Sequence, residues 1–122
     1  MIKNLWKLVK FYCTNGHEEP IPFDVQEGDS AFYACPQYFE LSNEHPNGHL
    51  PGSRACHNRL SFSDAEKIVT TLSKIIENDI DDNTFGSYTG LCFTSGFNRV
   101  KILEYSPKKI KIGVVNTLAV KN

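Results

Sequence analysis

Apolar and polar residues follow a helical spacing in the middle of the chain. Between residues 61 and 79, apolar residues recur every three or four positions, which predicts an amphipathic helix with one buried face. Ser63 and Glu66 form a capping box at its start, and Asp64 lies in the first turn, where the helix dipole favours an acid. The predicted buried face consists of Ala65, Ile68, Val69, Leu72, Ile75 and Ile76.

Three runs rich in β-branched and aromatic residues follow this helix. They cover residues 88–94, 100–105 and 110–115, and turn-forming residues separate them. In the last run, Ile110, Ile112 and Val114 alternate with a lysine and a glycine, so one face of the strand is apolar and the other is solvated. The pattern predicts a three-stranded antiparallel sheet that is covered by the amphipathic helix.

The first sixty residues have a less regular pattern. Residues 7–13 and 31–35 are predicted as short strands, each with an aromatic pair shortly before a cysteine, although residues 2–9 also fit a helical spacing. Residues 18–30 and 37–52 are predicted as connections because they are rich in proline, glycine and polar residues. We therefore expect one α+β domain over residues 1–122, with a metal-binding half (1–60), a helix (61–82) and an antiparallel meander (83–122).

Composition and charge limit the class of protein. Hydrophobic residues make up 40% and charged residues 22% of the chain, which is typical of a globular protein. A net charge of -1 argues against nucleic-acid binding by the whole surface. No segment has the pattern of a signal peptide or the roughly 20 apolar residues of a membrane span. We expect a cytoplasmic protein, in which four cysteines are better explained as metal ligands or buried thiols than as disulfides.

Three of the four cysteines lie among histidines between residues 11 and 59, which predicts a metal site. Zn²⁺ prefers four nitrogen or sulfur ligands in a tetrahedron, and a tight turn at Asn15-Gly16 can direct its two flanking side chains at one point. A tetrahedral, thiolate-rich site also accepts iron. The predicted ligands are Cys13, His17, Cys35 and Cys56. His45, His49 and His57 remain alternatives for the fourth ligand, because Cys35 and Cys56 are twenty residues apart and form no local pair.

Cys92 is predicted to stay outside the site. It lies in the middle of a predicted strand between Leu91 and Phe93, far in sequence from any histidine. We expect it to be a packed or half-buried thiol, as free cysteines commonly are.

The order of strand, Cys13, turn, His17 and second strand ending in Cys35 resembles the zinc-ribbon class, in which two knuckles at hairpin ends share one zinc ion. This resemblance covers residues 8 to about 59 and departs from the class at Cys35-Pro36, which has no close second ligand. Residues 34–39 and 55–59, followed by a capped helix, are also similar to small uncharacterised zinc-binding proteins of low-GC Gram-positive bacteria. That similarity implies a bound metal and no activity.

The first functional hypothesis is a structural zinc site in a small interaction or accessory protein with a protein partner. A second is a nucleic-acid accessory role for a basic patch near the C-terminus, interleaved with aromatic residues. The basic residues of this patch are Arg99, Lys101, Lys108, Lys109 and Lys111, and the aromatic residues are Phe93, Phe97 and Tyr105.

A zinc-dependent hydrolase is the third hypothesis. Carboxylates that could act as a base are present next to histidines, at Glu18, Glu19 and Glu44. No HExxH motif occurs, and the proline and glycine between His45 and His49 prevent a regular helix there. Solvated acids on loops explain these carboxylates better, so an enzyme is the less favoured reading.

Overall fold

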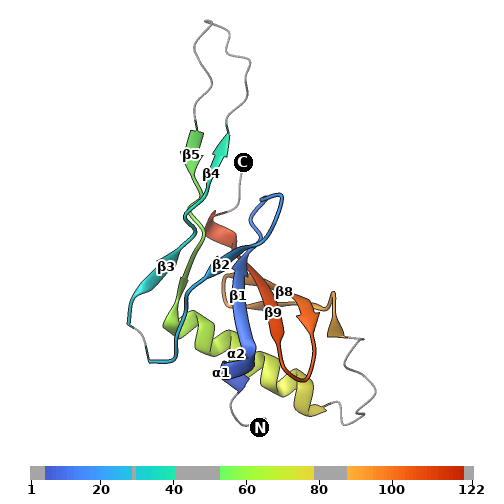
Figure 1. The fold of residues 1–122 in the computed structure, drawn as a ribbon. Helices are drawn as coiled ribbons and strands as arrows, with labels where there is room; N and C mark the ends of the chain where they lie inside the picture. The colour runs from blue at the N-terminus through green and yellow to red at the C-terminus, as the bar shows by residue number, and fades with distance from the viewer. Residues whose placement is uncertain (1–4, 29, 41–52, 79–87, 120–122) are drawn as a thin grey trace, which may run out of the picture.

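The computed structural model describes residues 5–28, 30–40, 53–78 and 88–119. The fold is mixed α+β, with most of its elements being strands (Figure 1). In chain order, the elements are α1 (Leu5–Leu8), β1 (Val9–Cys13), β2 (Ile21–Phe23), β3 (Phe32–Ala34), β4 (Tyr38–Glu40), β5 (Ser53–Ala55), β6 (Arg59–Ser61), α2 (Phe62–Asn78), β7 (Cys92–Ser95), β8 (Asn98–Tyr105), β9 (Ile110–Asn116) and the short 3-10 helix η2 (Thr117–Ala119).

A five-stranded sheet forms the centre of the molecule, with the strand order β2-β1-β9-β8-β7. Strands β7, β8 and β9 pair antiparallel, as predicted. The prediction of a three-stranded antiparallel sheet was incomplete, because β1 pairs in parallel with β9 and carries β2 on its other edge. Parallel neighbours need a long crossover connection, and here almost the whole chain lies between β1 and β9. No local pattern could have indicated this pairing.

Helix α2 matches the predicted amphipathic helix, but it begins earlier than the capping box implied. Its first residue is Phe62, and the Ser61 hydroxyl accepts a hydrogen bond of 3.1 Å from the Asp64 backbone N–H. Ser61 is therefore the N-cap residue, and the predicted box at Ser63 and Glu66 was wrong. Asp64 does lie in the first turn, as expected.

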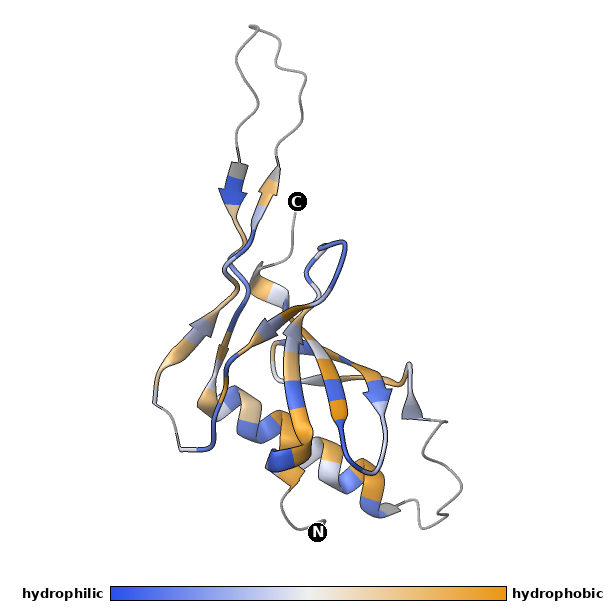
Figure 2. Ribbon diagram, in the orientation of Figure 1, coloured by the Kyte–Doolittle hydropathy of each residue, from blue (hydrophilic) through white to orange (hydrophobic). Residues whose placement is uncertain are grey.

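The core lies between α2 and one face of the sheet. The apolar face of α2 and the inward residues of β1, β8 and β9 belong to one hydrophobic cluster. Figure 2 shows apolar and polar positions alternating along these strands and recurring along the helix. None of the helices in the described part of the chain has the length and apolarity that a membrane span requires.

A two-stranded ribbon extends from this body and is clearly visible in Figure 1. One side of the ribbon is the chain from β3 to β4, and the other is the chain from β5 to β6. The two pairings share one register, since Ala34 faces Arg59 on one side of a short gap and Tyr38 faces Ala55 on the other. Strands β2 and β4 lie within residues 18–30 and 37–52, which were predicted as connections, and the short strand β5 was not predicted either.

Candidate metal centre

The four predicted ligands are brought together from three parts of the chain. Cys13 is the last residue of β1, and His17 follows it across a turn. Cys35 and Cys56 lie in the gap of the ribbon, directly after β3 and β5. The ligand atoms of all four side chains lie within 4.8 Å of one another.

The turn between Cys13 and His17 brings the histidine back to the cysteine. The Gly16 N–H donates to the Thr14 carbonyl at 2.8 Å, and Gly16 has a φ of 75°, a conformation that favours glycine. The predicted Asn15-Gly16 turn is thus confirmed. The ring of His17 then stacks on the ring of Phe39 in β4, with centroids 4.9 Å apart and 14° between the planes. Phe39 therefore fixes the orientation of the imidazole from the ribbon side.

The ribbon explains how Cys35 and Cys56 can share a site despite twenty intervening residues. In the gap, the Cys35 N–H donates to the Asn58 carbonyl at 3.0 Å, and the Cys56 N–H donates to the Gln37 carbonyl at 2.9 Å. Pro36 lies between these two hydrogen bonds and has no N–H to donate, which interrupts the strand pairing there. The two cysteines are therefore cross-strand neighbours at the point where regular pairing stops.

The distances within the cluster suit a tetrahedral metal ion. Metal–ligand distances of about 2.3 Å for sulfur and about 2.0 Å for nitrogen place tetrahedral ligands about 3.8 Å (S···S) and about 3.5 Å (S···N) apart. Cys13 Sγ lies 3.9 Å from Cys56 Sγ, and Cys35 Sγ lies 3.3 Å from His17 Nε2. All four cysteines of the chain are free, and 3.9 Å is far beyond the roughly 2.05 Å of a disulfide bond.

Two buried asparagines donate hydrogen bonds to the sulfur atoms. Asn58 Nδ2 donates to Cys13 Sγ at 3.0 Å, and Asn15 Nδ2 donates to Cys56 Sγ at 3.5 Å. The amide orientation of Asn58 follows from its other partners: Nδ2 also donates to the Val114 carbonyl, and Oδ1 accepts from the Asn116 N–H, both at 2.8 Å. Such donors stabilise a thiolate and link the cluster to β9.

Without a cation, burial makes the thiolate forms unfavourable. Burial raises the pKa of the Cys13 thiol above its ordinary value of 9.0, and the hydrogen bond from Asn58 opposes this rise. Burial, with a smaller contribution from the neighbouring charge of Cys13, raises the pKa of Cys35 to about 12. A divalent cation would reverse both shifts, because it supplies the positive charge that buried thiolates lack.

The remaining sequence candidates are placed differently. His57 is exposed and is not part of the cluster, and His45, His49 and Glu44 lie outside the described residues. Glu18 and Glu19 are exposed. Cys92 is also exposed, at the start of β7, so the prediction of a packed or half-buried thiol was wrong. Its side chain is on the outward-facing side of an edge strand, where alternation alone does not indicate burial.

Sequence reasoning missed three residues that support the cluster, namely Asn15, Phe39 and Asn58. Asn15 was recognised only as a turn residue, and Phe39 lies within residues 37–52, which were predicted as a connection. Asn58 gave no signal, because its partners in β1 and β9 are more than forty residues away in sequence. Proximity to a ligand in the sequence was the one available hint for Asn15 and Asn58.

Fold and site together define a small mixed α+β protein with a buried group of three cysteines and one histidine that can hold a metal ion. No family model, no curated protein and no solved structure matches the chain.

Proposed function

We propose that the protein binds one zinc ion through Cys13, His17, Cys35 and Cys56, and that this ion has a structural role. The observation that carries the proposal is the convergence of four ligand atoms within 4.8 Å of one another. Three thiolates and one imidazole are a common ligand set for structural zinc. Hydrogen-bond donors directed at two of the sulfur atoms support the same ligand chemistry.

A structural role is favoured over a catalytic one by the closed ligand set. A catalytic zinc usually has three protein ligands and an open position for water, whereas four protein ligands complete this tetrahedron. The three cysteines are buried, at 0%, 6% and 4% exposed for Cys13, Cys35 and Cys56. The nearby acids Glu18 and Glu19 are exposed and are not members of the cluster. These features speak against the hydrolase hypothesis.

The ion would join the ribbon to the main sheet. Two of its ligands come from the end of β1 and the following turn, and two come from the gap in the ribbon. The ribbon has only two strands, and a two-stranded pair is marginally stable by itself. In this proposal residues 1–122 form one domain in the cytoplasm, and the zinc ion holds the ribbon in a fixed position as part of an interaction or accessory module.

Metal analysis of the purified protein, together with thermal unfolding, tests this function. We expect about one zinc ion per chain by inductively coupled plasma mass spectrometry, and a lower melting temperature after chelation at neutral pH, because metal binding stabilises only the folded state. Replacement by Co²⁺ should give the visible d–d and thiolate charge-transfer bands of a tetrahedral site.

Serine variants of single cysteines test whether loss of metal is specific to the proposed ligands. Cys13→Ser and Cys35→Ser should lose the metal, while Cys92→Ser should retain it because Cys92 is exposed and lies outside the cluster. A melting temperature that chelation does not change would contradict the proposal. Stoichiometric iron in place of zinc would keep the site but reject the identity of the ion.

A further inference from the structure

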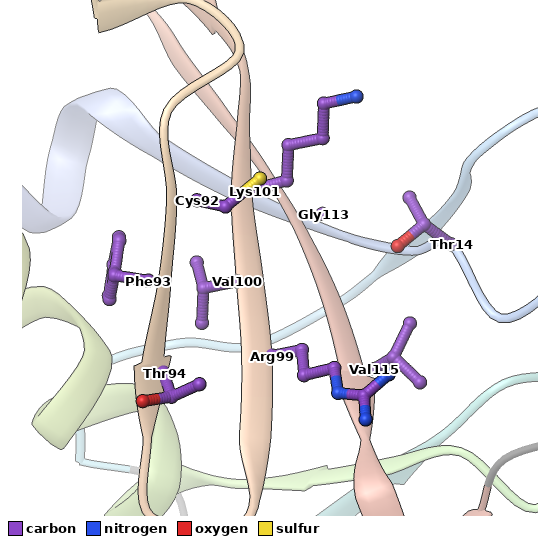
Figure 3. A pocket seen from close by; sticks show the side chains of 9 residues that line it. All are labelled: Thr14, Cys92, Phe93, Thr94, Arg99, Val100, Lys101, Gly113 and Val115. Atoms are coloured by element: carbon purple, nitrogen blue, oxygen red, sulfur yellow. The ribbon is translucent and has the colours of Figure 1, made fainter.

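The face of the sheet that is turned away from α2 carries a cavity flanked by cations. Its volume is about 340 Å³, within the usual range of small ligand sites. In Figure 3, Arg99 and Lys101 extend from β8 on either side of Gly113, and Cys92 and Thr14 close the cavity on its two flanks. The complete lining consists of Thr14, Cys92, Phe93, Thr94, Arg99, Val100, Lys101, Gly113 and Val115.

Strand register explains why this cavity forms. Gly113 of the central strand β9 lies between Tyr12 of β1 and Lys101 of β8, and Lys101 in turn faces Cys92 of β7. Gly113 has no side chain, and the side chains of Thr14 and Leu103 lie over it, since a Cβ placed there would be 2.7 Å from Thr14 Cγ2 and 3.3 Å from Leu103 Cδ2. Thr14 can therefore pack against the backbone of β9, and the cavity lies between Thr14 and the side chains of β7 and β8.

The charged residues around the cavity are available for a ligand. Arg99 and Lys101 are exposed, and neither forms an ion pair within the described part of the chain. They lie two residues apart on one strand, and their Cα atoms are therefore about 7 Å apart. The lining contains no acidic residue. This combination of two free cations and an apolar floor suits a ligand that has both an anionic group and a flat apolar body.

Positive charge continues beyond the cavity along the same face of the sheet. Lys111 follows on β9, with its neighbours Ile110 and Ile112 buried on the other face, and Lys10 of β1 is its partner in the parallel register. Glu104 is the register partner of Lys111, and Glu19 lines the same pocket as these two residues, so acids accompany this end of the row. A ligand with a single phosphate would use only part of this charge, whereas a strand of linked phosphates would use all of it.

We propose that this face binds single-stranded nucleic acid, with one base in the cavity between Thr14 and Cys92 and the phosphates along Arg99, Lys101, Lys111 and Lys10. The site differs from the basic and aromatic patch expected from the sequence. Tyr105 is buried and Phe93 is partly buried against the core, whereas Phe97 is 68% exposed but does not line the cavity. An acidic protein segment is the less favoured occupant, because carboxylate side chains gain nothing from the apolar floor.

Thiol labelling of the zinc-loaded full chain tests the proposal at the cavity itself. Cys92 is the exposed cysteine of the four and belongs to the cavity wall, so a bound strand should slow its reaction with a maleimide. The probes are a short oligo-dT, the mononucleotide dTMP, inorganic phosphate, double-stranded DNA and a poly-glutamate peptide. We expect protection by oligo-dT at concentrations at which the other four probes give none.

Charge variants then show which cations contribute to binding. The affinity for labelled oligo-dT is measured by fluorescence anisotropy. Arg99→Gln with Lys101→Gln should weaken binding at least about tenfold and reduce the salt slope of log K by about 1.4, since each single-strand phosphate contact contributes about 0.7. Lys108→Gln with Lys109→Gln removes the same charge from the exposed β8–β9 turn and should change affinity less than about twofold.

Three results would overturn the proposal. Equal losses in the two double variants would indicate unspecific attraction to the chain's positive charge. Equal protection by dTMP, phosphate, duplex or peptide would indicate a different ligand class. Absence of oligo-dT binding at low salt, in protein with its full complement of zinc, would exclude the nucleic-acid site while leaving the metal proposal untouched.

Discussion

Asn58 offers the sharpest test of how the candidate metal centre is connected to the sheet. Its side chain is fully buried and makes three hydrogen bonds, to Cys13 Sγ at 3.0 Å, to the Val114 carbonyl at 2.8 Å and from the Asn116 N–H at 2.8 Å. Asn58→Ala removes all three. A lost hydrogen bond costs about 0.5–1.5 kcal/mol, and a buried group left without a partner costs about 1–3 kcal/mol. We therefore expect the free energy of unfolding to fall by about 3–5 kcal/mol.

Urea unfolding followed by Trp6 fluorescence measures this change. Trp6 is the single tryptophan, and its ring lies 5.5 Å from that of Phe62 at the start of α2, so it reports on the core. Asn116→Ala is the matched control, because its side-chain oxygen accepts one hydrogen bond, from the exposed Leu118 N–H at 2.9 Å. The control should lose less than about 1 kcal/mol.

The role assigned to Asn58 would be refuted by a loss below about 1 kcal/mol, or by equal losses in Asn58→Ala and the control. Asn58→Asp distinguishes the packing of the side chain from its role as a hydrogen-bond donor, since it keeps the shape of the side chain and the acceptor for the Asn116 N–H. It replaces the donor to Cys13 by a carboxylate oxygen beside a thiolate. We expect this variant to lower metal affinity, measured by competition with a chromophoric chelator, more than Asn58→Gln does.

Three further predictions concern the ligands, pH and the helix cap. Cys13→Ser should lower the melting temperature strongly and Cys92→Ser hardly at all, and equal effects would mean that the site is misassigned. In the metal-free protein, the pKa of Cys35 is raised from 9.0 to about 12, so the folded state holds this proton more tightly than the unfolded state. Stability is then fully present below pH 9 and falls as the pH rises from 9 towards 12, whereas the metal-loaded protein should lose stability towards acid pH, where protons displace the metal. Melting temperatures measured across pH, with and without chelator, test both pH dependences. A metal-free protein whose melting temperature does not fall between pH 9 and 12 would contradict the prediction for Cys35. Ser61→Ala should cost about 1 kcal/mol by loss of the N-cap, with Ser63→Ala as the control that should change stability by less than about 0.5 kcal/mol.

Much of the secondary structure could be predicted because it is governed by local periodicity. Helix α2 buries one stripe of its surface, and β8 and β9 bury alternate residues, so the apolar spacing in the sequence reflects their environment directly. Strands of three residues, such as β2 and β4, are too short for a pattern of this kind. The predicted helix over residues 61–79 matches α2 closely, but its N-cap was misplaced because two serines near its start are equally suited to capping, and the backbone geometry decides between Ser61 and Ser63.

For the candidate site, residue type was informative and sequence spacing was not. Cysteine and histidine are chemically suited to bind a metal, and a reducing compartment was the reason to expect ligands rather than disulfides. The distance of twenty residues between Cys35 and Cys56 was an obstacle only along the chain, because the ribbon returns the second cysteine to a position diagonally across from the first.

The sequence by itself determined that this protein has an amphipathic helix, an antiparallel C-terminal sheet and a set of cysteine and histidine residues able to bind a metal. Only the tertiary structure decided that the first and last strands are neighbours, that Cys35 and Cys56 lie diagonally across a ribbon from each other, and that Asn58 connects the cluster to β9. The physical reason is that periodicity records which residues are buried, whereas contacts between distant segments depend on how the buried faces pack together. The sequence pattern therefore identified the candidate ligands, and the packing of β1, β9 and the ribbon determined how they meet.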